Sequence, residues 1–379
     1  MRRKAGAWIG MALALAVLTT GCGQAAEGAT SVNTETQKEE TQGQTVQSVE
    51  TQGESAGSSE PDSAAAGNGA QGAAGTQGAA GTQQTEEEAE PSVVYFTSDI
   101  SPEGLKKAYD QLNWTPEGNV AVKLSTGEPP ASNYLDPELI KDLVQSVNGT
   151  IVECNTAYGG SRSETAMHMQ VAKDHGFTAI ADVDILDAEG SMALPVEGGI
   201  RLSENLVGSH FGNYDSYLVL SHFKGHAMAG FGGAIKNISI GLGSQEGKCL
   251  IHTSGESHNS PWGDDQTGFT ESMAEAGKSV SDYLGNGERI VYVSVLNNIS
   301  IDCDCNGNPA EPDIHDIGIL ASTDLVAIDQ ASIDLAFAAE GSEALQRRVG
   351  DRQGLHTLEH AEEIGLGVRD YELVSIDEQ

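Results

Sequence analysis

Residues 120–154, VAVKLSTGEPPASNYLDPELIKDLVQSVNGTIVEC, form one strand–helix–strand unit. The apolar runs from Val120 to Leu124 and from Thr150 to Cys154 are typical of short buried strands. Between them, Asp136 precedes a proline and a glutamate, the pattern of a helix N-terminus, and an amphipathic segment continues through Val147. Two buried strands joined by a helix indicate a parallel sheet covered by helices.

The same alternation extends to both sides of this unit. It predicts an α/β fold with a mostly parallel sheet and helices on both faces, built as one domain or as two closely packed lobes. The predicted strands are 93–97, 179–185, 217–220, 289–295, 317–320 and 371–376, and the predicted helices are 101–113, 163–175, 271–284 and a segment that Asp324 opens. Residues 195–215 and 253–268 show no recognisable pattern.

Residues 1–22 have the pattern of an export signal: basic residues, an apolar run from Ala7 to Val17, and then Leu18-Thr19-Thr20-Gly21-Cys22. A small residue directly before a cysteine resembles the lipobox of bacterial lipoproteins, which implies acylation of Cys22 and a lipid anchor in the membrane. The alternative is an ordinary cleaved signal with an incidental cysteine. The apolar run is too short for a stable membrane-spanning helix.

Residues 23–90 are rich in Gly, Ala, Ser, Thr, Gln and Glu, and repeat GAAGTQ at 72–77 and 78–83. Without aromatic residues such a segment cannot bury enough surface to fold, so we expect a disordered acidic tether. Residues 91–379 remain for the folded domain, with 44 acidic and 16 basic residues and a formal charge of −28. This charge argues against nucleic acid as a partner and suits an extracytoplasmic protein.

The stretch 221–252, SHFKGHAMAGFGGAIKNISIGLGSQEGKCLIH, combines histidines and lysines with many glycines. Glycine allows positive φ and close approach of the backbone to a ligand, while histidine and lysine serve as proton carriers, metal ligands or anion contacts. We expect Lys236 and Asn237 to contact an anion or another small-molecule ligand, because a lysine buried alone is costly. His222, Lys224 and His226 could line the same site or simply cap a glycine-rich turn.

Two further segments have the residue types of a site. Arg162 and the hydroxyls of loop 155–163 precede a predicted helix, which favours anion binding, although the arginine could instead pair with an acid. Cys303 and Cys305 are separated by one residue, which makes a mutual disulfide unlikely and metal chelation plausible. The alternative is that they form disulfides with Cys154 or Cys249. His168 and His175, seven residues apart on one predicted helix, are expected to lie at the surface or in packing contacts.

Three segments together resemble the domain of unknown function 362 family: SHFKGHAMAGFGGAIKNISIGLGS, NISIDCDC and DIGILASTDLVAIDQASIDL. AYGGSRSETAMHMQVAKDHGF fits the same family, and the resemblance covers most of residues 93–340. Many members carry an appended ferredoxin module. This chain lacks the repeated C-x-x-C spacing of that module, so the resemblance implies no iron–sulfur cluster of this kind.

The segment from His226 to Lys236 is also similar to the nickel-pincer lactate racemase family. That resemblance implies that Lys236 anchors a cofactor, that His252 ligates a metal and that His226 transfers a proton. The family's second catalytic histidine is replaced here by Ser161. Zinc, iron and nickel are the candidate metals, with His252, Cys303 and Cys305 as candidate ligands.

The sequence leaves two functions open. The first is a metal-dependent enzyme acting on a small acid, with His226 and Lys236 as catalytic residues and Arg162, His222, Lys224 and Asn237 as ligand contacts. The second is a non-catalytic extracellular binding protein for a small acid or glycan.

Overall fold

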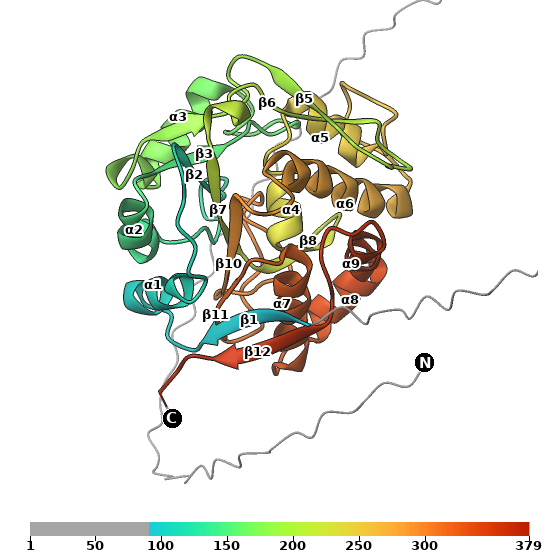
Figure 1. Cartoon of the computed structure of the whole chain (residues 1–379). Coiled ribbons are helices and arrows are strands. Elements are labelled where there is room, and N and C mark those ends of the chain that lie inside the picture. Colours follow the sequence, from blue (N-terminus) through green and yellow to red (C-terminus); the bar gives the residue numbers. More distant parts are fainter. Residues whose placement is uncertain (1–90, 379) are drawn as a thin grey trace, which may run out of the picture. The chain divides into compact units, whose positions relative to one another are not determined.

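The computed structural model describes residues 91–378 (Figure 1). An eight-stranded sheet runs through the molecule in the order β12-β1-β11-β10-β7-β2-β3-β4. Only β11 is antiparallel to its neighbours, so the sheet is mostly parallel as predicted. Its strands are β1 (Ser92–Thr97), β2 (Val120–Lys123), β3 (Gly149–Glu153), β4 (Val183–Ile185), β7 (Ser216–His222), β10 (Ile290–Leu296), β11 (Gly318–Ser322) and β12 (Tyr371–Ser375).

Helices cover both faces of this sheet, as the alternation predicts (Figure 1). One face packs against α1 (Pro102–Asp110), α2 (Pro137–Ser146) and α3 (Thr165–Asp174). The other face packs against α4 (Ala234–Ile238), α6 (Gln266–Tyr283), α7 (Leu325–Ala338), α8 (Glu343–Asp351) and α9 (Gly354–Glu363). The interior strands are buried on both sides, which explains why they read as continuous apolar runs.

The helix starts follow the local signals in the sequence. Ser101, Asp136 and Asp324 each accept a hydrogen bond from a backbone N–H of the first turn that follows, and a proline occupies the first helical position after Ser101 and Asp136. These side chains satisfy donors that have no partner within the helix. The strand–helix–strand unit of residues 120–154 is therefore confirmed in position and type.

One element prediction is wrong. Instead of a strand over 179–185, Phe177–Ala179 form a 3-10 turn after Gly176, and only Val183–Ile185 pair with β3. Gly176 has a positive φ of 89°, and the chain folds back onto the core through buried Phe177 before it reaches the sheet.

Several elements have no clear counterpart in the sequence pattern. They are the hairpin of β5 (Ser191–Pro195) and β6 (Glu204–Gly208), the small pair of β8 (Lys224–His226) and β9 (Gly230–Gly232), and the helices α4, α5 (Gln245–His252), α8 and α9. A second 3-10 turn, Phe211–Asn213, precedes β7.

In the glycine-rich stretch, only Gly230 has a positive φ, 81°. Gly233 and Gly241 are required for close packing instead. A Cβ at Gly233 would lie 2.3 Å from Oδ1 of Asp329, and one at Gly241 would lie 2.1 Å from the backbone oxygen of Asn237. The glycines therefore bring helices and side chains close together more than they turn the chain.

The predictions for residues 1–90, including the signal, acylated Cys22 and the tether, lie outside the described residues. Within residues 91–378, no helix is long and apolar enough to cross a membrane.

Candidate functional site

A cavity of about 330 Å³ opens at the carboxyl ends of β2, β3 and β7. From β2 the chain proceeds through β3 to β4 at one edge, whereas β7 leads to β10 in the opposite direction. The point where strand order reverses is where open α/β sheets usually bind ligands. Loop 155–163 supplies part of the wall, as the sequence predicts, and the remainder comes from Ser125, α4, α5, β8 and loop 303–305.

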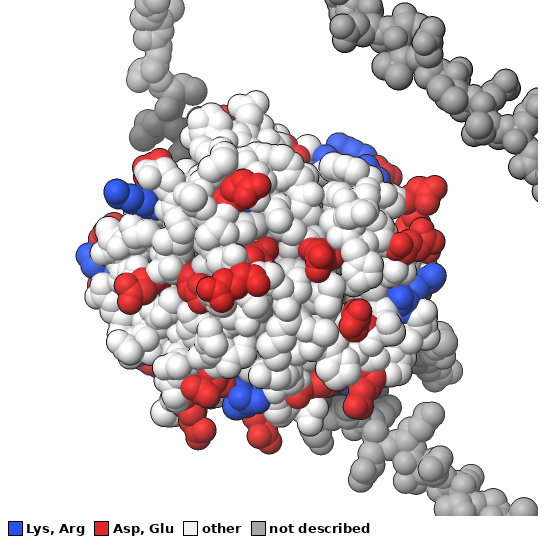
Figure 2. Space-filling view, turned by 90° about the horizontal axis from the view of Figure 1, so that it is seen from above, with Lys and Arg blue, Asp and Glu red and all other residues white. Residues whose placement is uncertain are grey.

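The charge of the cavity is opposite to that of the protein. Five basic residues line it, Lys123, Arg162, Lys224, Lys236 and Lys248, but only two acidic residues, Glu153 and Asp304. The outer surface is mainly acidic, and the face shown in Figure 2 displays many more acidic than basic side chains. A local excess of cations in an acidic protein makes this cavity the natural place for an anion.

Two of the lysines that line the cavity, Lys123 and Lys248, are buried. Lys123, at the end of β2, is 1% exposed and donates hydrogen bonds to the backbone oxygen of Leu124 (2.6 Å) and to Oδ1 of Asn237 (2.9 Å). Lys248 on α5 donates to the backbone oxygen of Gly243 (2.5 Å). Burial lowers the pKa of Lys123 to about 8, and the charge of Lys248 adds to this, although the charge of Glu153 acts in the opposite direction.

Lys236 on α4 is partly buried, and its ammonium has no hydrogen-bond partner among residues 91–378. Burial, reinforced by the charge of Lys123, lowers the pKa of Lys236 to about 8. None of Lys123, Lys236 and Lys248 forms a salt bridge with a carboxylate within the part of the chain that the structure describes. Three ammonium groups thus share a cavity in which none of them forms a salt bridge, although the charges of Glu153 and Asp304 act on Lys123 and Lys236 from further away.

Asp329 of α7 fixes the start of the helix that presents Lys236. Its carboxyl oxygens accept hydrogen bonds from the backbone N–H groups of Ala234 (2.7 Å) and Ile235 (2.9 Å). Burial raises the pKa of Asp329 to about 7. Gly233 leaves the room that this contact requires. Helix α4 is therefore held rigidly against α7, and Lys236 projects from it toward the cavity.

The charge of Lys224 is compensated by a carboxylate of the protein. It forms an ion pair with Asp304 and donates to the backbone oxygen of Asn133 (2.8 Å). Although burial opposes ionisation of Asp304, the charge of Lys224 lowers its pKa to about 2. His222 completes the group, with Nε2 2.7 Å from the backbone oxygen of Asn297 and Nδ1 3.4 Å from Asp304. This cluster holds loop 303–305 against the cavity.

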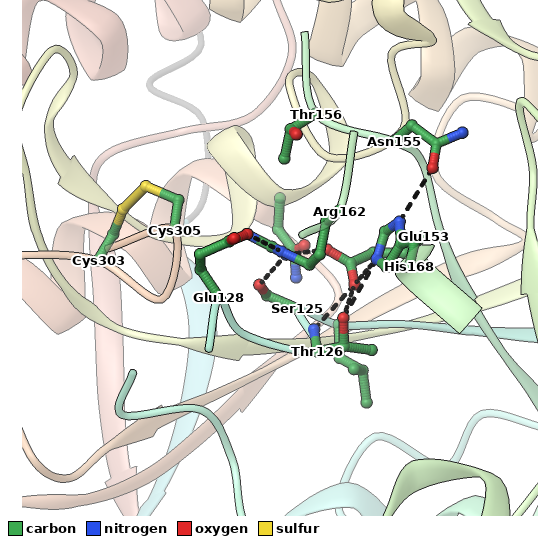
Figure 3. Close-up of polar contacts among 12 residues, drawn as sticks. Ser125, Thr126, Glu128, Glu153, Asn155, Thr156, Arg162, His168, Cys303 and Cys305 are labelled. Carbon is green, nitrogen blue, oxygen red and sulfur yellow. Dashed lines mark hydrogen bonds and ion pairs between the residues drawn. A yellow bond between two sulfur atoms is a disulfide. The ribbon is translucent and has the colours of Figure 1, made fainter. Parts of the chain in front are cut away.

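Arg162 lies in a buried polar network shown in Figure 3. Its guanidinium is paired with Glu153 (2.8 Å) and Glu128 (3.2 Å), and it is 3% exposed. Burial opposes ionisation of Glu153, but the charge of Arg162 keeps the pKa of that carboxyl well below its usual range. The carboxylate also contacts His168, 3.1 Å away. Arg162 thus lines the cavity, but two carboxylates already compensate its charge.

His226 has a fixed tautomer. Its Nδ1 accepts hydrogen bonds from the backbone N–H groups of Met228 (3.1 Å) and Ala229 (2.9 Å), so in the neutral ring the proton is on Nε2. Burial, together with the charge of Lys236, keeps the pKa of His226 well below its usual range. His226 therefore offers a hydrogen-bond donor at neutral pH.

His252 has the opposite tautomer. Its Nδ1 lies 2.7 Å from the backbone oxygen of Lys248, which can only accept, so Nδ1 carries the proton and Nε2 a free lone pair. Burial lowers the pKa of His252 to about 4, and the ring stacks on Phe269. An N–H bonded to a backbone carbonyl is the usual arrangement for a metal-ligating histidine, and it equally suits a proton acceptor.

Cys303 and Cys305 form a disulfide, so the prediction that they would not bridge each other is wrong. Their Cα atoms lie 5.3 Å apart because the intervening Asp304 turns the chain inward, and this distance is within the range of ordinary disulfides. The alternative partners, Cys154 and Cys249, are free and buried.

The potential ligand atoms of His226, Cys303 and Cys305 lie within 4.8 Å of one another, so the three could hold a metal ion. They could bind a metal only in a chemical state other than the observed one, because the disulfide offers no thiolate and Nε2 of His226 carries a proton. Of the predicted metal ligands, His252 alone presents a free lone pair in the observed state. In the observed state, therefore, neither this group nor the predicted ligands His252, Cys303 and Cys305 fit a metal.

The cavity contains every predicted site residue of the folded domain, although their assigned roles stay predictions. Lys123, Glu153 and Lys248 also line the cavity and were not predicted from the sequence. Lys123 and Glu153 are charged residues at the ends of apolar strands, a signal that could have identified them. Asn237 lines the cavity but braces the backbone: its Nδ2 donates to the oxygen of Leu220 (3.1 Å). His168 is not at the surface but fully buried.

Comparisons with known proteins give a family. The family model described as "Domain of unknown function (DUF362)" matches residues 120–334, more than half of the chain. No curated protein matches.

Two solved structures show distant similarity. The lactate racemase apoprotein from Thermoanaerobacterium thermosaccharolyticum is 16% identical, with a TM-score of 0.35, over 54% of this chain and 50% of that one. A crystal structure of a Thermotoga maritima protein from a structural genomics programme is 12% identical, with a TM-score of 0.36, over 70% and 59%. This chain therefore covers less than two thirds of either protein, and such low TM-scores support no functional argument.

Proposed function

This chain belongs to the DUF362 family, whose description assigns no activity, and from its cavity we propose that it binds a small organic anion. The observation that supports this most strongly is the group of three ammoniums, those of Lys123, Lys236 and Lys248, that share a cavity and form no salt bridge with a carboxylate among the described residues. Buried like charges raise the free energy of the empty site, and a bound anion removes that cost.

The remaining lining narrows the ligand class. About 330 Å³ is at the small end of ligand pockets, which favours a small acid over a long chain. His226 can donate to an acceptor atom of the ligand and His252 can accept from a hydroxyl or other donor. Met228 and Trp262 add apolar surface, and Trp262 is 68% exposed. An acid with two or more anionic groups and a hydrogen-bonding substituent matches this set.

The test is thermal unfolding of the purified chain at pH 7 with a panel of mono-, di- and tricarboxylates at constant ionic strength. A ligand that binds only the folded state raises the melting temperature as its concentration exceeds Kd. We expect di- or tricarboxylates to stabilise the wild type and the control Lys278→Met, whose lysine pairs with Asp282 on α6, and to stabilise Lys236→Met much less. If no acid stabilises the wild type beyond its effect on Lys236→Met, the proposal fails.

A second candidate is a cofactor-dependent enzyme acting on a small acid. The presence of both Lys236 and His252 in one cavity favours it. A lysine with a pKa of about 8 has far more free amine at neutral pH than an ordinary lysine and can form a covalent adduct. Elemental analysis and intact mass of the chain from its native host test this. Extra mass on Lys236 or a stoichiometric metal would favour the enzyme, and an unmodified, metal-free chain would leave the binding function.

We also propose that the protein is anchored outside the cytoplasm through acylated Cys22 and does not bind nucleic acid. The lipobox-like segment supports the first statement and the formal charge of −28 supports the second. Cys22→Ala should release the protein from the membrane fraction of its host. Retention of that variant in the membrane would contradict lipid anchoring.

A further inference from the structure

The disulfide between Cys303 and Cys305 is part of the cavity wall. Both cysteines are partly exposed, whereas Cys154 and Cys249 are free and buried. A disulfide that stabilises a fold usually closes a long loop, but this one spans a single intervening residue and can contribute little in that way. Its position against a ligand-sized space suggests a chemical function.

The turn that holds the two sulfurs is fixed independently of the bond between them. The side chain of Asp304, between the cysteines, is paired with Lys224 and is 6% exposed. Its backbone oxygen accepts a hydrogen bond from the N–H of Glu128 (2.7 Å), and the oxygen of Cys303 accepts one from Asn306 (2.9 Å). Breaking the disulfide would therefore leave both sulfurs at the cavity wall.

The surroundings favour thiolate chemistry at this disulfide. The lysines of the cavity make its potential positive, and reactive cysteines are found in such partly exposed, electropositive places. Nε2 of His226, which carries the proton of the neutral ring, lies 3.9 Å from Sγ of Cys305. This N–H is placed to stabilise negative charge on Cys305 more directly than on Cys303.

We propose that Cys303–Cys305 is a redox-active disulfide that exchanges with anionic low-molecular-weight thiols drawn into the lysine-lined cavity. A thiolate attacks Sγ of Cys303, a mixed disulfide forms, and the electron pair of the broken S–S bond remains on Cys305, beside His226. A second thiolate then attacks the sulfur of the first thiol within the mixed disulfide. This attack releases the oxidised thiol dimer and leaves Cys303 as a thiolate. Both protein thiolates then take up protons, so two thiols are oxidised and one disulfide is reduced.

This activity goes beyond anion binding and can be tested without knowing the natural ligand. The full chain is incubated with mercaptosuccinate, a dicarboxylate thiol, or with neutral 2-mercaptoethanol, then alkylated at timed intervals and mapped by peptide mass. After correction for the thiolate fraction, we expect mercaptosuccinate to open Cys303–Cys305 at least about tenfold faster. Equal corrected rates, or no opening by either thiol, would overturn the proposal.

Two variants test the origin of that preference. Lys236→Met should reduce the preference for mercaptosuccinate several-fold, and Lys278→Met, on the outer surface of α6, should leave it unchanged. If both variants behave alike, the cavity charge is not responsible. Salt gives a second measurement on the unaltered chain: the preference should fall as ionic strength rises, and a salt-independent preference contradicts the electrostatic argument.

The trapped intermediate tests the role of His226. The mixed disulfide should map to Cys303 and the free thiol to Cys305. The reverse assignment would overturn the proposed leaving group. The reduced protein should keep its far-ultraviolet circular dichroism and its cooperative unfolding, because Asp304 and Lys224 hold the turn. Loss of folded structure on reduction would show that the disulfide is structural.

Discussion

Replacing Lys236 by methionine should make the protein more stable while it weakens anion binding. The side chain forms no hydrogen bond or salt bridge within residues 91–378, so methionine removes a charge at similar volume and breaks no contact. A lysine with a mainly structural role would give the opposite result, because its removal would lower stability.

The magnitude follows from the pKa of Lys236. Its fall from 10.5 to about 8 corresponds to about 3 kcal/mol, at about 1.4 kcal/mol per pH unit. Because the side chain keeps some contact with solvent, we expect about half of this, roughly 1.5–2 kcal/mol. For a domain of this size the melting temperature at pH 7 should rise by about 3–8 °C.

The pH dependence provides the control. The folded pKa is lowered, so the unfolded chain binds more protons between pH 8 and 10.5. The cost of the lysine is fully present below pH 8 and disappears as the pH approaches 10.5. Thermal unfolding should therefore show a stabilised Lys236→Met variant at pH 7 and only about a quarter of that difference at pH 10. A variant that is less stable at pH 7, or equally shifted at both pH values, would refute this reasoning.

Three further predictions concern pH and buried charge. Calorimetry should show that the affinity for the anion falls above pH 8, because Lys123 and Lys236 then lose their protons. The fall should be up to about tenfold per pH unit for each lysine. Constant affinity up to pH 9.5 would exclude both lysines as contacts. Arg162→Met should lower the free energy of unfolding by about 3–5 kcal/mol in urea titrations, because two buried carboxylates lose their partner; a loss below about 1 kcal/mol would contradict this. Burial lowers the pKa of His356, but the hydrogen bonds and charges of Glu271 and Glu359 together raise it above its usual value. The stabilisation from His356 is therefore present below about pH 6.5 and lost as the pH rises through the folded pKa. His356→Gln should melt earlier than the wild type at pH 5.5 but not at pH 9, and an equal shift at both would refute the pairing.

The parts of the fold that the sequence predicts are those with strong local signals. The strands at Val120 and Thr150 are mainly apolar, and the helix between them begins with Asp136 and a proline. Such patterns depend on burial and capping within a few residues, so one segment is enough to recognise them. The 3-10 turn at Phe177 depends instead on how the chain packs after Gly176, which no short segment reveals.

The sequence predicts some residues of the site but not the contacts between them. The glycine-rich stretch indicates Lys236 and His252 because polar residues stand out in it. The compensation of Arg162 by Glu128 and Glu153 depends on contacts across 34 and 9 residues, and so does not follow from the loop alone. Likewise, the spacing of Cys303 and Cys305 does not reveal that the chain between them turns enough for a disulfide.

The most direct test of anion binding is calorimetric titration at pH 7 and fixed ionic strength. The carboxylate that most stabilises the wild type would be titrated into the wild type, Lys236→Met and Lys278→Met. We predict one binding site in the wild type, unchanged affinity in Lys278→Met, and at least about tenfold weaker binding in Lys236→Met, equal to about 1.4 kcal/mol. Equal affinity in all three proteins, or no heat of binding with any acid, would contradict the assignment of this cavity as an anion site.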